Sequence, residues 1–166
     1  MRYSGHLARL FAAGVFACAL GGGHRALAGD MFQDLIAAWN AHDPDKVAAM
    51  FTSDALYEDV ALGIKSQGTD QIRKFAKFTF DAVPDMKIEL VDSFSSGSHG
   101  YSEWVLSGTD VGIFKTGKTF SFRGTSINDI AGSKFSRNLD YYDLSTVMKQ
   151  EGLLPAETAQ ADQPAH

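Results

Sequence analysis

A segment near the C-terminus holds the residues with the clearest capacity for acid/base chemistry. Residues 134–144 have the aromatic content of a β-strand, yet they include carboxylates. Side chains two positions apart lie on the same face of a strand, so Asn138, Asp140 and Tyr142 share one face. A carboxylate in an apolar interior has a raised pKa and can act as a general acid or base near neutral pH. We therefore predict that Asp140 faces a pocket, the alternative being a solvent-facing or purely structural carboxylate.

A second polar pair is expected on a short strand over residues 56–60. Tyr57 and Asp59 share one face of this strand by the same alternation. If that face meets the one that carries Asp140, the three side chains form one polar cluster, and we expect Tyr57 on the wall of the pocket that opposes Asp140. Two alternatives stay open: Tyr57 is a core aromatic residue with a satisfied hydroxyl, and Asp59 caps a turn before Gly63.

The elements that must position these side chains begin with helices. An N-cap at Asp30 and the helical spacing of apolar residues predict a first helix over residues 30–41. Asp43 followed by Pro44 repeats the start signal for a short second helix. A third helix is predicted to begin at Thr69 or at the residue before it.

Beyond residue 84 the hydrophobic pattern changes from the period of a helix to that of strands. Strands are predicted over residues 86–90, 101–106 and 120–130 and through Asp140, with turns rich in Gly and Ser between them. A helical turn over residues 144–150 closes the chain. Helices followed by an antiparallel meander predict an α+β fold, in which a curved antiparallel sheet wraps over three N-terminal helices.

The N-terminus has the pattern of a secretory signal peptide. A positively charged start precedes an apolar run over residues 10–20, and an A-x-A site predicts cleavage after Ala28. The sequence thus predicts a signal peptide over residues 1–28 and a periplasmic or secreted protein. The alternatives are a retained membrane anchor, for which the apolar run is short, and lipid attachment at Cys18.

The rest of the chain is predicted to be one domain with a tail. The domain spans residues 29–154, a length that a single hydrophobic core ordinarily serves. Residues 155–166 lack apolar periodicity and are predicted to be a disordered tail.

Cleavage after Ala28 would change the composition in ways that exclude several classes of function. The chain would lose its single Cys and three Arg, and its formal charge would move from −5 to −8. Without Cys, no disulfide or Cys-ligated metal can form. No two His have the spacing of metal ligands, and no Gly-rich loop joins a strand to a helix. We predict no metal, no cofactor, no nucleic-acid partner and no membrane span after cleavage.

Six short motifs follow one another through the chain. They are WNAHD (39–43), ALYED (55–59), GTDQI (68–72), EWVLSGT (103–109), TGK (116–118) and DYYDL (140–144). Their order and spacing resemble the SnoaL-like polyketide cyclase branch of the nuclear transport factor 2-like superfamily. The resemblance implies a cone-shaped sheet around a deep apolar pocket, with a polar residue of the last long strand working inside it.

The resemblance also implies roles for the residues of the site. Asp140 matches the acid/base Asp of SnoaL-like cyclases, and Tyr57 is expected to donate a hydrogen bond to a developing oxyanion. The predicted binding residues are Asp59, Trp104, Asn138, Tyr142 and Phe122. The expected ligand is a small, largely apolar carbonyl compound, and the expected reaction is a cofactor-independent cyclisation or isomerisation. The alternative is a non-catalytic ligand-binding or dimerisation module of the cell envelope.

The strands carry aromatic residues on both of their faces. Trp104, Phe120, Phe122 and Tyr141 lie on these strands, in which neighbouring positions alternate in direction. Aromatic side chains on one face can line the pocket, while those on the other face can pack against a second copy of the protein. We therefore expect a homodimer.

Overall fold

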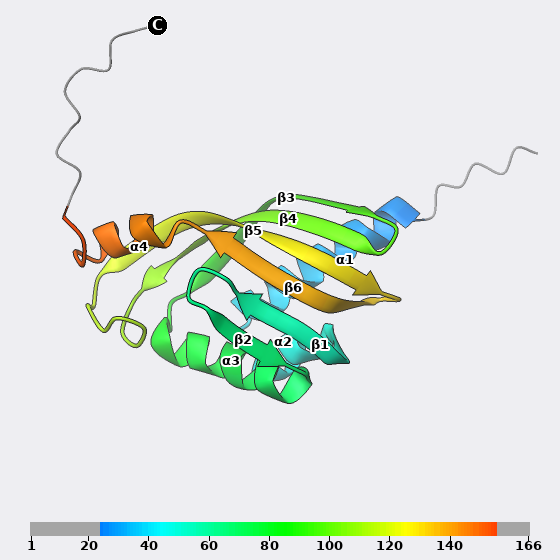
Figure 1. Cartoon of the computed structure of the whole chain (residues 1–166), viewed down its shortest axis with the longest axis horizontal. Coiled ribbons are helices and arrows are strands. Elements are labelled where there is room, and N and C mark those ends of the chain that lie inside the picture. Colours follow the sequence, from blue (N-terminus) through cyan, green and yellow to red (C-terminus); the bar gives the residue numbers. More distant parts are fainter. Residues whose placement is uncertain (1–23, 156–166) are drawn as a thin grey trace, which may run out of the picture.

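The computed structural model describes residues 24–155, with side chains from Met31 onward. The helices are α1 (His24–Asn40), α2 (Pro44–Ala49), α3 (Thr69–Ala82) and α4 (Leu144–Gln150). The strands are β1 (Phe51–Asp59), β2 (Ile64–Gln67), β3 (Lys87–Ser96), β4 (His99–Thr109), β5 (Thr119–Ala131) and β6 (Lys134–Tyr142). The α+β fold class is confirmed (Figure 1).

Two predictions concern the chain ends, which lie outside the residues that the structure describes. Most of the predicted signal peptide, including Cys18, and residues 156–166 of the predicted tail lie outside the described residues. The first helix differs from the prediction, since it begins at His24 rather than at an N-cap at Asp30. Residues 24–29 include three Ala or Leu, which are strong helix formers, so the helix extends towards the N-terminus through the expected cap. The predicted cleavage point after Ala28 falls within the bounds of α1.

The motif at residues 39–43 joins the helices to the sheet. Trp39 is buried in the core. The Asn40 amide brackets the backbone of Ile88, with its Nδ2 donating to the carbonyl at 2.7 Å and its Oδ1 accepting from the N–H at 2.8 Å. Asp43 then caps α2 by accepting hydrogen bonds from the backbone N–H groups of Asp45 and Lys46. These contacts fix the end of α1 against the start of β3.

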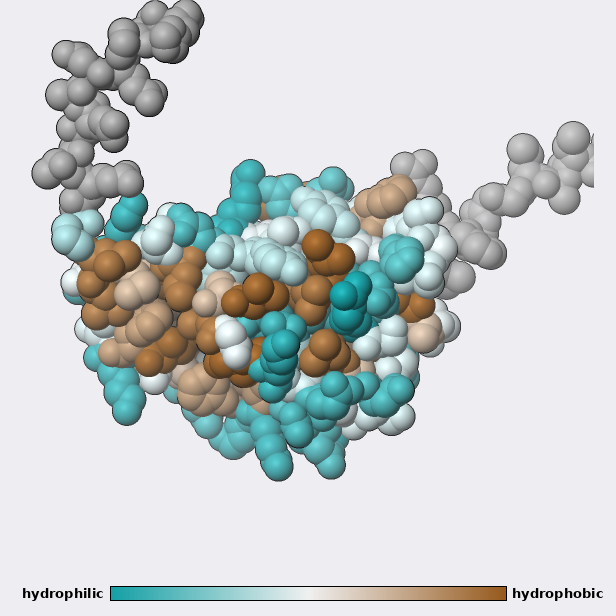
Figure 2. All heavy atoms as spheres, in the orientation of Figure 1, coloured by the Kyte–Doolittle hydropathy of each residue, from teal (hydrophilic) through white to brown (hydrophobic). Residues whose placement is uncertain are grey.

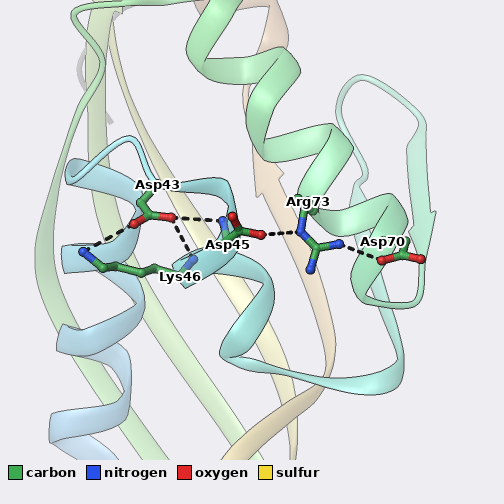
Figure 3. A network of polar contacts seen from close by, with 5 residues as sticks. All are labelled: Asp43, Asp45, Lys46, Asp70 and Arg73. Carbon is green, nitrogen blue, oxygen red and sulfur yellow. Dashed lines mark hydrogen bonds and ion pairs between the residues drawn. The ribbon is translucent and has the colours of Figure 1, made fainter.

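A chain of charged side chains crosses from α2 to α3 on the surface (Figure 3). The Arg73 guanidinium contacts Asp45 of α2 and Asp70 of its own helix, with N to O distances of 2.6 Å each. Both carboxylates are largely open to solvent and the Arg73 side chain is 41% exposed, so the pairs add little to the free energy of unfolding. The helices are instead held by apolar packing, in which Val47 of α2 and Ile72 of α3 are fully buried.

The six strands form one curved sheet in the order β2-β1-β6-β5-β4-β3. In Figure 1, α1 runs behind the sheet, α3 lies along the β1 and β2 edge, and α4 sits at one end. The expectation of a wholly antiparallel sheet needs one correction, because β1 and β6 pair in parallel. Parallel neighbours need a long crossover, and here α3 and the whole β3 to β5 meander separate them in the chain.

An irregularity in β6 decides which side chains enter the core. Phe135 is fully buried and so is Asn138, three positions later, which strict alternation does not allow. The register with β5 shifts between Asp129 and Ile130, so that Ser136 has no partner of its own. This β-bulge rotates the strand and brings Asn138 and Asp140 to the inner face behind Phe135.

Candidate active site

The inner face of β6 carries the predicted polar residues. Asn138 and Asp140 are 1% and 8% exposed, and Tyr142 is partly buried behind them. The pocket-facing prediction for Asp140 is therefore supported by its position, and the solvent-facing alternative is wrong. The carboxylate also makes the hydrogen bonds of the structural alternative, so both features occur together.

Asp140 accepts hydrogen bonds from three side chains on three strands. Ser126 Oγ of β5 donates to Oδ1 at 2.6 Å, and Asn138 Nδ2 of β6 donates to the same oxygen at 2.7 Å. The Tyr57 hydroxyl of β1 donates to Oδ2. Burial raises the pKa of Asp140 to about 6, although the three donors act in the opposite direction. A carboxyl group with this pKa exchanges its proton readily near neutral pH.

Tyr57 lies beside Asp140 rather than across the pocket from it. The expectation that Tyr57 lies on the opposing wall is wrong, because β1 and β6 are neighbours and Tyr57 is in register with Asn138. Burial, together with the nearby Asp140, raises the pKa of the Tyr57 hydroxyl well above its usual value. The hydroxyl therefore keeps its proton and remains a hydrogen-bond donor at any physiological pH.

Asp59 both caps a turn and belongs to the polar cluster of the pocket. Its Oδ1 accepts from the backbone N–H of Leu62 at 2.9 Å, which caps the turn before Gly63. Its Oδ2 accepts from the Tyr142 hydroxyl at 3.1 Å inside the pocket. Burial raises the pKa of Asp59 and is also the largest cause of the raised pKa of Tyr142. The pocket thus contains two neighbouring carboxylate and tyrosine pairs, since Asp59 and Asp140 are partners in the β1 to β6 register.

Further hydrogen bonds, from Trp104 and Asn128, orient two of the donors of Asp140. The Trp104 indole donates from Nε1 to Ser126 Oγ at 2.9 Å, so this residue holds a donor as well as forming the wall. Asn128 Nδ2 donates to Asn138 Oδ1 at 2.6 Å. Sequence reasoning missed Ser126 and Asn128, although both occupy inward positions of β5. Knowing the β5 to β6 register would have identified them, because they pair with Asp140 and Asn138.

The pocket around these groups is walled mainly by apolar side chains. Phe122 and Tyr142 pack with their ring centroids 4.5 Å apart, and Trp104 meets both rings edge-on. Trp39 and Phe75 line the side formed by the helices. All predicted site residues, Asp140, Tyr57, Asp59, Trp104, Asn138, Tyr142 and Phe122, line this one pocket. A small, mostly apolar molecule with one polar group suits such a lining.

The connection between β4 and β5 covers one end of the pocket. Asp110 is fully buried, and its carboxylate accepts from the backbone N–H groups of Gly112, Ile113 and Phe114 at 2.7 to 3.0 Å. These bonds curl the segment so that Ile113 and Phe114 line the pocket. Asp110 therefore shapes the pocket without offering a free oxygen to a ligand.

In residues 24–155, no three His, Cys, Asp or Glu side chains gather in a way that could hold a metal ion. Among the helices of that same part of the chain, none has the length and apolar character needed to cross a membrane.

Comparison with known proteins assigns the family. The SnoaL-like domain model matches residues 32–138, which is more than half of the chain. The chain therefore belongs to the SnoaL-like family, and the resemblance to that branch of the nuclear transport factor 2-like superfamily is confirmed. A comparison with curated proteins gives no match.

Solved structures with the same fold include three instructive relatives. A protein of ketosteroid isomerase-like fold from Catenulispora acidiphila, in complex with trimethylamine, is 25% identical with a TM-score of 0.70, covering 77% of this chain and 95% of that one. TsrD from Streptomyces laurentii is 23% identical with a TM-score of 0.68, covering 78% and 97%. A Jannaschia protein that carries the name SnoaL-like polyketide cyclase is 14% identical with a TM-score of 0.69, covering 79% and 95%. The last two show the fold alone.

Proposed function

We propose that this protein is a cofactor-independent acid/base enzyme of the cyclase or isomerase type, acting on a small, largely apolar carbonyl compound. The observation that carries the proposal is the Asp140 carboxyl group, which is buried in an apolar pocket with a pKa of about 6 and three hydrogen-bond donors. The SnoaL-like family includes proteins named polyketide cyclases, which supports this class of reaction.

The reaction begins with proton transfer from the carbon beside the carbonyl to Asp140 Oδ2. The electron pair of that C–H bond moves into the enolate, and negative charge leaves the Asp140 carboxylate for the enolate oxygen. Tyr57, whose hydroxyl donates to Oδ2 in the free protein, can then transfer its hydrogen bond to the enolate oxygen. Returning the proton from Asp140 to another carbon gives an isomer. Alternatively, the enolate carbon attacks a second carbonyl carbon and closes a ring, and the alkoxide oxygen formed there takes the proton back from Asp140.

Ser126 and Asn138 stay on Asp140 Oδ1 throughout this sequence. They are buried and held in turn by Trp104 and Asn128, so they keep the carboxyl group in one orientation while Oδ2 exchanges its proton. The Tyr142 and Asp59 pair lies beside them and contributes binding and a nearby negative charge.

The first prediction tests this chemistry with a β,γ-unsaturated ketone such as allyl heptyl ketone, whose isomerisation to the conjugated ketone is followed by ultraviolet absorbance. We expect Asp140→Asn to lower turnover by at least about a hundredfold, as loss of a general base does. Ligand affinity, read from the fluorescence of the pocket residues Trp39 and Trp104, should be retained. The matched control Asp129→Asn changes a carboxylate on the outer face and should leave turnover unchanged.

A wild-type protein that binds the ketone without turnover would instead favour the alternative, a non-catalytic ligand-binding or dimerisation module of the cell envelope. The buried pocket alone supports ligand binding, whereas the raised pKa of Asp140 is the feature that favours catalysis.

The second prediction concerns export. We propose that the protein is periplasmic or secreted, on the evidence of the signal-peptide pattern over residues 1–28. Expressed from its natural start in a bacterium with a periplasm, it should be recovered from that compartment with Gly29 or a close neighbour as its first residue. Intact-mass analysis is the measurement, and retention of Met1 or a lipid on Cys18 contradicts the proposal.

A further inference from the structure

Glu151, just beyond α4, is a buried carboxylate that the proposed chemistry does not use. It is 1% exposed and lines the same pocket as Asp140. Its Oε2 accepts a hydrogen bond from the Thr116 hydroxyl, which ties α4 to the segment between β4 and β5. Its Oε1 is buried and has no hydrogen-bond partner within the described residues.

A buried acceptor without a donor is costly, so the position of Oε1 needs an explanation. Within the described residues no donor lies within hydrogen-bond distance of this oxygen. Phe114, Phe120 and Val147, which line the same pocket, are apolar and offer none. Asp110, the other carboxylate at this end, is occupied by three backbone N–H groups and is itself an acceptor. The Lys118 ammonium lies against Gly152, the next residue, but makes no hydrogen bond to Oε1. Within the described residues this oxygen is therefore left open to a donor group of a molecule in the pocket.

The strand β5 gives the separation between the two polar ends of the pocket. The Gln150 side chain brackets the backbone of Ser121, which fixes α4 at that level of the strand. Asp140 lies at the level of Ser126, five residues further along β5. Five residues of strand correspond to about 17 Å, and inward-pointing side chains shorten that distance. The pocket therefore has a polar group with an available carboxylate oxygen towards each end, Asp140 at one and Glu151 at the other, and mainly apolar walls between them.

We infer that Glu151 Oε1 binds a hydrogen-bond donor, a hydroxyl or an ammonium group, at the far end of an elongated apolar ligand. The inference deepens the proposed function and rests on it for the other end, where the carbonyl group meets Asp140 and Tyr57. It narrows the substrate class to extended carbonyl compounds that carry a donor group remote from the reacting carbon.

The test uses three probes of equal length: methyl nonyl ketone, its analogue with a terminal hydroxyl, and its analogue with a terminal amine. Affinities are read from the fluorescence of Trp39 and Trp104, which are the only Trp residues of the chain and both line the pocket. We expect the wild type to bind at least one donor-bearing analogue about tenfold more tightly than methyl nonyl ketone, as a hydrogen bond to a charged group provides.

Variants then assign the preference to Glu151. Glu151→Leu should abolish it without weakening the binding of methyl nonyl ketone. Glu151→Gln keeps the shape and an acceptor oxygen, so it should retain a preference for the hydroxyl and lose one for the ammonium group. Thr116→Val removes the hydrogen bond to Oε2 but leaves Oε1, and it should preserve the preference.

Equal affinity of the wild type for all three probes would overturn the inference, and so would a preference that persists in Glu151→Leu. Equal loss of the preference in Thr116→Val would show that Glu151 acts only by holding α4 in place. These affinities do not depend on turnover, so a protein that fails to isomerise ketones can still show or lack the preference. The two proposals therefore fail separately.

Discussion

Two effects act in opposite directions on the pKa of Asp140. Burial raises its pKa, and three hydrogen-bond donors lower it, so the group remains ionisable near neutral pH instead of being permanently protonated. The donors differ in freedom. Ser126 and Asn138 each accept a hydrogen bond from a further side chain, which fixes their orientation. Within the described residues, the Tyr57 hydroxyl has a hydrogen bond to Asp140 alone. Because of this difference, Tyr57 is the donor whose hydrogen bond can move from Asp140 to the enolate oxygen of a substrate.

The third prediction follows from the pKa of Asp140. Its folded value of about 6 exceeds the reference value of 3.8, so its contribution to stability is present below pH 3.8 and is lost as the pH rises to about 6. The shift of about two units corresponds to roughly 3 kcal/mol. Wild type should therefore lose stability relative to Asp140→Asn between about pH 4 and pH 7.5. Denaturant unfolding curves of both proteins at the two pH values measure the difference.

The control for that measurement is Asp129→Asn. The Arg137 guanidinium, and to a smaller extent His99, lowers the pKa of Asp129, so its contribution is present at neutral pH and is lost on acidification. Between about pH 4 and pH 7.5 the stability difference between wild type and Asp129→Asn should therefore change little, and it should shrink only at lower pH, which is opposite to the trend for Asp140. If Asp140→Asn and wild type respond equally to pH, Asp140 titrates normally and the acid/base proposal loses its physical basis.

At the scale of elements, strand alternation predicts the inner face of β6 correctly, but it does not predict the partners across the sheet. With the hairpin turn after Ala131, a regular β5 to β6 ladder would place Thr125 opposite Asp140. The bulge at Ser136 shifts the register by one residue and places Ser126 there instead. Nothing in the sequence marks this bulge with a Gly or a Pro. The helices and strands were therefore predictable, while the donors Ser126 and Asn128 were not.

A side chain of β4 packs closely against the backbone of β5 at Gly124. Trp104 and Gly124 are in register, and the indole ring lies directly over Gly124, where a Cβ atom would collide with the ring. The same indole donates to Ser126 and forms the pocket wall. The absence of a side chain at Gly124 is thus a requirement of the site.

The fourth prediction is that Gly124→Ala destabilises the protein by about 1 to 3 kcal/mol, as overpacking of a filled core does. The added methyl group must displace the indole, so the fluorescence of Trp104 should change as well. Denaturant unfolding is the measurement. In the background Trp104→Phe, whose smaller ring leaves more room, the same substitution should cost less. Equal costs in the two backgrounds would show that the indole does not explain the Gly at this position.

At the scale of the whole molecule, the face of the sheet opposite the pocket carries a row of exposed apolar side chains. Phe94, Tyr101 and Ile127 occupy one row across β3, β4 and β5 and are all exposed, with Phe94 at 60%. Tyr141 of β6 is exposed nearby, in the next row of the register. Ion pairs such as Arg123 with Glu103 lie on the adjoining rows. Figure 2, viewed from the side away from α1, shows brown apolar patches among teal polar ones.

This arrangement supports the expected homodimer. A twofold axis through the row would bury the apolar side chains of both copies against each other and leave the charged rows as a polar rim. The residues that line the pocket lie on the opposite side of the sheet, so pairing through this face would not cover them. Trp104 and Phe122 belong to the pocket side, whereas Tyr141 belongs to the outer face, in agreement with the alternation that the sequence predicts.

The fifth prediction is that the protein has the mass of a dimer in light scattering at micromolar concentration, and that Ile127→Lys converts it to a monomer. A charge in the middle of the buried row would lose its hydration without gaining a partner, which is costly at an interface. The control Val111→Lys changes an exposed apolar residue in the segment between β4 and β5, away from this face, and should leave the dimer intact. Ligand binding should survive in both variants, because neither residue lines the pocket. A wild type that scatters as a monomer throughout the micromolar range, or an Ile127→Lys variant that remains dimeric, would show that this face does not join two copies.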